Sequence, residues 1–149
     1  MGARRYRQSG MTDWNQQIID EFRANEGRVG GNFEGRTLLL LHHTGAKSGK
    51  PYVNPLAYQR VSDNAVAIFA SKGGAPTTPD WFYNLVAHPD VKVEIGTETF
   101  SAHARVAEGV EREPIWEKQK SDWSGFADYE KQTEGIREIP VVVLDLEQS

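Results

Sequence analysis

Two glycines, two lysines and a serine stand close together in the stretch "HTGAKSGKPYVNPL", residues 43–56. Glycines let neighbouring backbone N–H groups converge on one point, and such a concavity binds anions. Lys47 and Lys50 add positive charge, and Ser48 adds a hydroxyl donor. The stretch predicts a loop that holds the phosphate of a ligand, although composition alone equally allows a solvated hairpin turn.

The same stretch is not the phosphate loop of nucleotide hydrolases. That loop needs four residues between its first glycine and its glycine–lysine pair, with a serine or threonine directly afterwards. Here Gly45 and Gly49 enclose three residues, and Pro51 stands where the hydroxyl should be. The pattern therefore argues against a nucleotide hydrolase.

A second basic loop follows in "ASKGGAPTTPDW", residues 70–81. It places Lys72 before paired glycines and ends in Thr78 and Pro79, a favourable N-cap and first residue for a helix. The N-terminus of a helix also favours negative charge. Two basic, glycine-rich loops in a chain of net charge -4 favour a shared anionic ligand over coincidence.

Other chemistries find little support in the sequence. His42 and His43 are adjacent and would point to opposite faces of a strand, while His88 and His103 are isolated, so no metal site is expected. The chain has no cysteine, which excludes disulfides and thiolate metal ligands. A nucleophile elbow is also missing, so hydrolysis is not indicated.

Length and composition predict one folded domain over residues 12–149, preceded by a flexible basic arm over residues 1–11. The negative net charge argues against nucleic-acid binding, and the longest apolar run, "TLLLL", is too short to span a bilayer. The lack of cysteine fits a reducing cytoplasm. Peripheral contact of the arm with a membrane stays open, as does the choice between a monomer and a homodimer.

The expected elements are mostly strands. A helix over residues 12–27 would bury Trp14, Ile18 and Phe22 on one face and stop at Gly27. Pro55 marks its strand as an edge or a bulge. The predicted strands cover residues 36–45, 52–61, 65–71, 91–96, 97–107 and 139–146, with a short helix at 80–88 and a polar, helix-prone segment at 108–135.

Strands that follow one another through short turns cannot form parallel crossovers, which need a long connection each. The sequence therefore predicts an antiparallel barrel, mainly β with peripheral helices. Closing the sheet removes exposed edges, and small barrels often bind ligands at their mouths.

The two basic loops also carry a resemblance. "HHTGAKSGKPYVNPLAY" and "ASKGGAPTTPDWFYNLVAHPDVKVEIG" resemble the deazaflavin-dependent nitroreductase family, the actinobacterial reductases that use coenzyme F-420, and "DYEKQTEGIREIPVVVLDL" resembles the family's last helix and strand. The resemblance covers roughly residues 12–146. It implies an antiparallel split β-barrel of the flavin-reductase type that binds the reduced deazaflavin in a groove.

The resemblance also implies site residues. The loop at residues 46–51 would hold the cofactor phosphate, while residues 56–58 and 70–72 would border the deazaflavin ring. The implied cofactor contacts are Leu41, His42, Ala46, Lys47, Ser48, Gly49, Lys50, Pro51, Asn54, Leu56, Ala57, Tyr58, Ala70, Ser71 and Lys72. Trp123, Phe126 and Tyr129 would close the substrate side, where family members often carry several tyrosines.

Hydride chemistry needs no acid–base pair or metal in the protein, only orientation of cofactor and acceptor and the exclusion of water. Tyr129 is the candidate proton donor, with a purely structural role and proton supply by solvent as alternatives. The expected function is reduction of an activated alkene, such as an unsaturated ester or lactone, a quinone or a nitroaromatic. The alternatives are a split barrel that binds flavin mononucleotide or heme, and a non-enzymatic carrier of deazaflavin or lipid.

Overall fold

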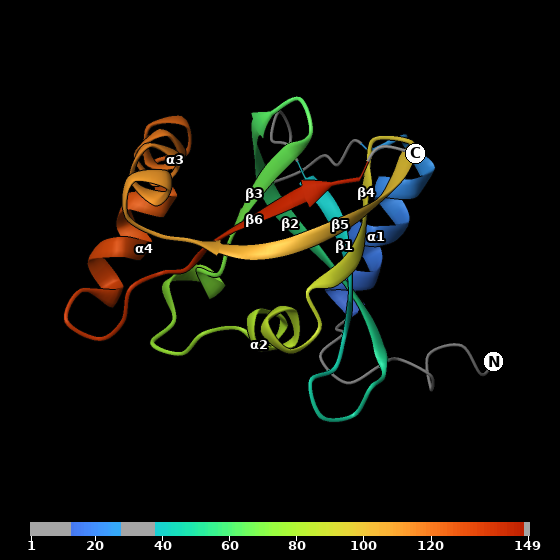
Figure 1. Ribbon diagram of the computed structural model, residues 1–149, viewed down its shortest axis with the longest axis horizontal. Helices are drawn as coiled ribbons and strands as arrows, with labels where there is room; N and C mark the ends of the chain where they lie inside the picture. The colour runs from blue at the N-terminus through green and yellow to red at the C-terminus, as the bar shows by residue number, and fades with distance from the viewer. Residues whose placement is uncertain (1–12, 28–37, 148–149) are drawn as a thin grey trace.

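Six antiparallel strands close into a barrel in the computed structural model, which describes residues 13–27 and 38–147 (Figure 1). The order around the barrel is β1-β2-β3-β6-β5-β4. The strands are β1 (Leu38–Thr44), β2 (Pro51–Ser62), β3 (Ala65–Phe69), β4 (Asp90–Ile95), β5 (Glu98–Ala107) and β6 (Val141–Leu146). The antiparallel barrel predicted from the short turns is confirmed, whereas the basic arm lies outside the described residues.

Helices cover the outside of the barrel (Figure 1). The helix α1 (Asp13–Ala24) lies on one side, the helices α3 (Gly109–Asp122) and α4 (Gly125–Thr133) lie on the opposite side, and α2 (Asp80–Ala87) lies below. One turn of 3-10 helix, η3 (Lys72–Gly74), precedes α2. The helix-prone segment at 108–135 is thus two helices rather than one.

The run of four leucines in β1 is buried from both sides, as its unbroken apolar character predicts. Leu39 and Leu41 face the barrel interior, while Leu38 and Leu40 pack against Ile18, Ile19 and Phe22 of α1. These α1 residues include two of the three predicted for its buried face; the side chain of Trp14 lies outside the described part.

The C-terminal end of α1 needs a glycine. Gly27 has φ +94°, and a Cβ atom there would lie 2.7 Å from the Cα atom of Gly96 in the β4–β5 turn. Any other residue would force these two backbones apart. Gly96 itself belongs to the predicted two-residue hairpin turn, since Ile95 pairs with Glu98.

The β2 strand changes partner halfway along its length. It pairs with β1 over residues 51–57 but with β3 only over residues 58–62. Pro55 therefore lies where β2 is an edge strand on its β3 side, so its missing N–H disturbs no ladder there. The edge position expected from Pro55 is found, and this open edge leaves room for a cleft.

The start of α2 differs from expectation by one residue. Pro79 is the N-cap, with φ -65° and ψ 150°, and the helix begins at Asp80. The sequence had favoured Thr78 as the cap. Pro79 takes that place because its extended backbone ends the preceding loop, and the acidic Asp80 in the first turn complements the helix dipole.

Candidate active site

A cleft of about 840 Å³ opens beside the free edge of β2. Its walls come from α1, the turn between β1 and β2, the loop after β3, α2, and the α3–α4 connection. We call residues 45–50 the lysine turn and residues 70–75 the glycine loop. Both line the cleft, so the two basic loops that the sequence predicted to share a ligand do share one cavity.

Most of the predicted site residues face this cleft. They come from both loops, the β2 edge and the aromatic segment: Ala46, Lys47, Ser48, Asn54, Leu56, Ala57, Ser71, Lys72, Trp123, Phe126 and Tyr129. The cleft is thus lined both by basic groups, Lys47 and Lys72, and by apolar or aromatic side chains. This distribution suits a flat ligand with an anionic tail.

The remaining predicted residues lie elsewhere: Leu41, His42, Gly49, Lys50, Pro51, Tyr58 and Ala70 are not among those that line the cleft. Leu41 and Ala70 are fully buried in the barrel core, against which Tyr58 packs. Lys50, the last residue of the lysine turn, is exposed and does not line the cleft. For Leu41 and His42 on β1 the placement follows from strand alternation, because neighbouring side chains on a strand point to opposite faces.

His42 illustrates this alternation. Its Nε2 lies 2.5 Å from Glu94 Oε2, and Arg23 donates to the same carboxylate at 2.7 Å. The hydrogen bond from Arg23 lowers the pKa of Glu94. His42 therefore belongs to a surface ion-pair group that joins β1, β4 and α1, away from the lining of the cleft.

The lysine turn is held mainly by its own backbone. Gly45 N–H donates to Lys50 C=O at 2.8 Å, Gly49 N–H donates to Gly45 C=O at 3.0 Å, and Lys50 N–H donates to Ser48 Oγ at 3.2 Å. A Cβ atom on Gly45 would lie 2.3 Å from Ser48 Oγ. The N–H groups of Gly45, Gly49 and Lys50 are thus used to hold the turn in shape, while the Lys47 side chain lines the cleft.

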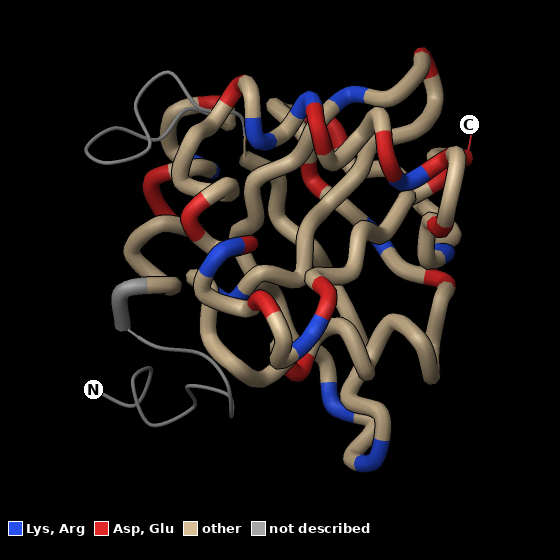
Figure 2. Tube along the Cα trace, turned by 90° about the vertical axis from the view of Figure 1, so that its left-hand side faces the viewer, with Lys and Arg blue, Asp and Glu red and all other residues tan. Residues whose placement is uncertain are grey.

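Charge on the lysine turn is one-sided. Figure 2 shows basic residues without an acidic neighbour on the projecting turn, whereas both signs are interspersed over the rest of the molecule. The turn therefore offers positive potential at the mouth of the cleft although the whole chain is acidic.

The glycine loop has an unusual backbone. Lys72, Gly73 and Gly74 have φ values of +49°, +64° and +83°. A left-handed conformation is costly for lysine and persists only where surrounding structure enforces it. A Cβ atom on Gly74 would lie 2.3 Å from Gln132 Oε1 and 3.2 Å from Tyr129 Cδ1, so the loop rests directly on α4.

Arg137 holds the glycine loop from behind. Its Nε, Nη1 and Nη2 donate to the carbonyl oxygens of Ala75, Ala70 and Ser71 at 3.1, 3.2 and 2.9 Å. Burial lowers the pKa of this guanidinium. The sequence analysis missed Arg137, because its partners lie more than sixty positions away in the sequence.

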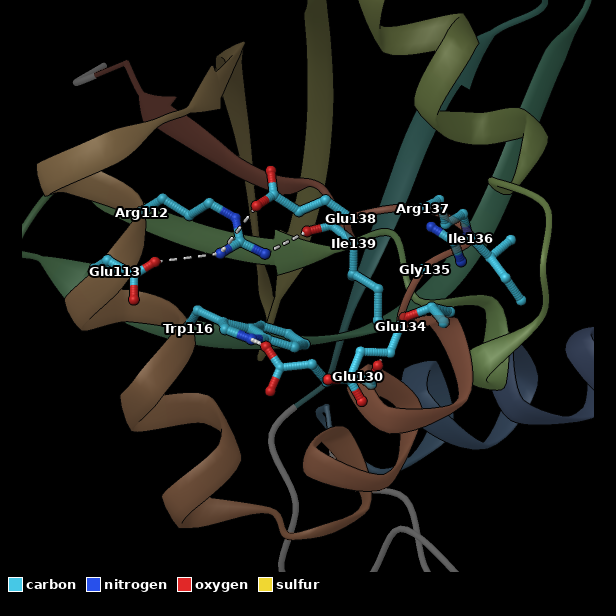
Figure 3. Close-up of a pocket in the computed structure, with 11 residues that line it drawn as sticks. Arg112, Glu113, Trp116, Glu130, Glu134, Gly135, Ile136, Arg137, Glu138 and Ile139 are labelled. Atoms are coloured by element: carbon cyan, nitrogen blue, oxygen red, sulfur yellow. Dashed lines mark hydrogen bonds and ion pairs between the residues drawn. The ribbon is translucent and has the colours of Figure 1, made fainter.

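The segment that carries Arg137 is itself anchored. Figure 3 shows Arg112 of α3 reaching the residues before β6, where its Nη2 donates to Ile139 C=O at 2.8 Å. Arg112 is 8% exposed and lies 5.4 Å from the centre of the Trp116 ring. A second cavity of about 530 Å³ lies here, between α3, α4 and the segment at 134–139.

An aromatic cluster forms the far wall of the cleft. Phe126 makes edge-on contacts with Trp123 at 5.4 Å and Tyr129 at 5.2 Å between ring centres, and it also packs on Phe69 and Trp116. Phe126 is buried, while Trp123 and Tyr129 are half-buried. Phe126 thus positions the two rings that are more accessible to a ligand.

The sequence analysis also missed a buried polar network under the lysine turn. Ala46 N–H donates to Asn84 Oδ1 at 2.8 Å, Asn84 Nδ2 lies 3.0 Å from His43 Nδ1, and His43 Nε2 lies 2.7 Å from Asn54 Oδ1. All four residues line the cleft. Asn84 therefore supports the lysine turn and also lines the cleft.

Two absences hold for residues 13–27 and 38–147. No group of three or more histidine, aspartate or glutamate side chains is placed to hold a metal ion. Within the same ranges, every helix is too short or too polar to cross a membrane.

Comparison with known proteins identifies the family. A family model described as "F420H(2)-dependent quinone reductase" matches residues 14–146. A Mycobacterium tuberculosis (strain H37Rv) F420H(2)-dependent quinone reductase is 37% identical over 127 residues, which cover 83% of each chain.

Solved structures agree with this match. One described as an F420-H2 dependent reductase has a TM-score of 0.66 and 37% identity, covering 72% of this chain and 93% of its own. Another, described as a domain-swapped dimer, has a TM-score of 0.67 and 33% identity, covering 89% and 98%. The heme storage protein HutZ of Vibrio cholerae, with a TM-score of 0.55 and 16% identity, shares the fold alone.

The family model spans nearly the whole described chain, and the cleft has the basic loops and aromatic wall that the resemblance implied. The chain therefore belongs to the F420H(2)-dependent quinone reductase family, as a split-barrel reductase that uses reduced coenzyme F-420.

Proposed function

We propose that this enzyme transfers a hydride from reduced coenzyme F-420 to a quinone bound in the same cleft. The observation that carries the proposal is one cavity lined by Lys47 and Lys72 from two different loops and by the aromatic side chains Trp123, Phe126 and Tyr129. Quinone as acceptor is supported by the family description and by the aromatic rings of Trp123 and Tyr129 in the lining of the cleft. Activated alkenes and nitroaromatics are the competing acceptors.

The residues present fit the cofactor. Coenzyme F-420 combines a planar ring with a phosphate-bearing tail, and the lysine turn offers Lys47 beside a glycine whose Cβ would collide with Ser48. Lys72 lies across the same cleft, where its Nζ donates to Thr77 Oγ1 at 3.2 Å. The β2 edge at Leu56 and Ala57 borders the space for the ring.

When bound, the reduced cofactor supplies the hydride. The protein binds and orients: Lys47 and Ser48 hold the tail, the β2 edge limits ring movement, and the aromatic wall excludes water from the reacting face. The quinone gains the hydride and one proton and becomes the hydroquinone. Tyr129 would deliver that proton from its hydroxyl group, and solvent would then restore it.

The test has two stages. Fluorescence titration of oxidised coenzyme F-420 should show binding at micromolar protein, and the reduced cofactor should then be consumed faster with a menaquinone analogue than with an unsaturated lactone or a nitroaromatic. Lys118→Ala is a matched control, since Lys118 pairs with Asp122 on the exposed side of α3. An absence of binding, or a preference for the lactone or nitroaromatic, would contradict the proposal.

A further inference from the structure

We propose that His43 is a positioning residue whose Nε2–H fixes the Asn54 side chain so that the Asn54 NH2 group donates to an acceptor atom of the bound cofactor. This inference rests on the proposed function, because it concerns the same cleft. It gives His43, which belongs to the network under the lysine turn, a role toward the bound ligand.

The direction of every hydrogen bond in the network follows from one backbone group. Ala46 N–H can only donate, so the Asn84 atom that faces it is the carbonyl oxygen Oδ1. Asn84 then turns its NH2 group toward His43 Nδ1, which must accept and therefore carries no hydrogen. The neutral ring has its proton on Nε2, which donates to Asn54 Oδ1 at 2.7 Å.

The consequence for the ligand follows at Asn54. Its carbonyl oxygen is engaged by His43, so its NH2 group is the part directed by the network toward other partners. Asn54 lies on the open edge of β2 and lines the cleft. The complementary ligand group is a hydrogen-bond acceptor, such as a ring carbonyl or a phosphate oxygen.

The surroundings of His43 keep the ring neutral. His43 is 6% exposed, Asn84 is 8% exposed, and the Tyr52 ring stacks on His43 at 5.6 Å. Burial is the largest influence and lowers the pKa of His43; the hydrogen bond with Asn54 opposes it, His42 adds to it, and the net shift is downward. A proton on Nδ1 would oppose the Asn84 NH2 group and break the network.

Other charged groups surround His43 from several elements. Lys47 of the lysine turn and Asp80 of α2 line the main cleft with it. A smaller cavity of about 350 Å³ joins His43 to Asp90 and Lys92 of β4 and to Glu147 after β6. These groups carry charges of both signs. The buried hydrogen bonds, rather than any single charge, therefore decide which nitrogen of His43 carries the hydrogen.

The first test uses the free protein and needs no cofactor. NMR of 15N-histidine-labelled protein should show the His43 Nδ1 unprotonated and Nε2 protonated at neutral pH, with Asn84→Asp moving a proton onto Nδ1. A wild-type ring protonated on Nδ1, or unaltered by Asn84→Asp in a folded variant, would overturn the inference.

The second test measures binding of oxidised coenzyme F-420. Asn54→Asp replaces the NH2 donor by a charged acceptor, so its dissociation constant should rise at least tenfold. His43→Gln can still donate to Asn54 from the end of its side chain and should bind better than His43→Asn, which is too short to do so. Circular dichroism verifies that each variant is folded, and Lys118→Ala serves as the unaffected control.

The results distinguish failure of the proposed function from failure of the inference about His43 and Asn54. A wild-type protein that binds no coenzyme F-420 overturns the proposed function together with the Asn54 contact. Wild-type binding with an unchanged dissociation constant for Asn54→Asp, or equal binding by the two His43 variants, overturns the inference alone. Tenfold weaker binding by Asn54→Asp, the Nε2–H form of His43, and tighter binding by His43→Gln than by His43→Asn together support it.

Discussion

The two basic loops of the cleft are held by different means. The lysine turn closes on its own backbone and rests on a neutral network of two asparagines and a histidine. The glycine loop is held by the cationic fork of Arg137 and lies against α4, which carries Tyr129. The lysine turn is therefore held independently of α4, whereas the glycine loop is coupled by direct contact to the helix that carries Tyr129.

The largest effect should come from removing the support of the glycine loop. Arg137→Met deletes three charged hydrogen bonds to backbone carbonyls, and we expect the free energy of unfolding to fall by about 3 kcal/mol. Urea unfolding measures the loss, with Arg137→Lys as a variant that keeps the charge but not the fork. Equal stability of wild type and Arg137→Met would show that the loop needs no such support.

The next effect distinguishes the two lysines of the first loop. Lys47→Ala should weaken binding of coenzyme F-420 by about 1.5–3 kcal/mol, the scale of one charged hydrogen bond. Lys50→Ala should have a smaller effect, because Lys50 does not line the cleft. The sequence alone gave Lys50 the same weight, so equal losses in a fluorescence titration would restore that prediction.

The contact between the glycine loop and α4 can be tested with neighbouring glycines. Gly74→Ala places a Cβ atom against Gln132 and Tyr129 at φ +83°, and should cost more stability than the roughly 1–2 kcal/mol of the left-handed backbone alone. Gly73→Ala has a similar φ of +64° but meets nothing within 4 Å, so it isolates the backbone strain. If both variants lose the same stability, the packing on α4 contributes nothing.

The acceptor side should respond separately from the cofactor side. Tyr129→Phe keeps the ring contact with Phe126 but removes the hydroxyl group, so we expect reduction to slow about tenfold, below the usual range for a sole proton donor because solvent can substitute. The dissociation constant of coenzyme F-420 should stay the same. Loss of both would indicate structural damage instead.

The smallest effect is a dependence of stability on pH. Because burial lowers the pKa of His43, the unfolded chain binds this proton first as the pH falls. The stability contributed by the neutral ring is complete above the unfolded pKa and declines below it. Urea unfolding at about pH 7.5 and pH 5.5 should show a larger loss for wild type than for His43→Asn; equal losses would contradict a neutral, buried His43.

Sequence patterns predicted the framework well. Continuous apolar runs in β1 and β6 and short turns indicated buried antiparallel strands, and Pro55 indicated the open edge of β2. The pattern of the two loops pointed to a shared cleft, which the structure contains. The structural roles of two residues were not predicted. The hydrogen-bond partners of His43 are not close to it in the sequence, and Arg137 donates to carbonyl groups more than sixty positions away.

The sequence by itself determined the barrel, its family and the location of both basic loops, because hydrophobic period, turn residues and local motifs are properties of neighbouring positions. Only the tertiary structure decided which lysine enters the cleft and how His43 is protonated. Those outcomes depend on the face on which each strand residue emerges and on groups that closure of the barrel brings together, such as Ala46 and Asn84.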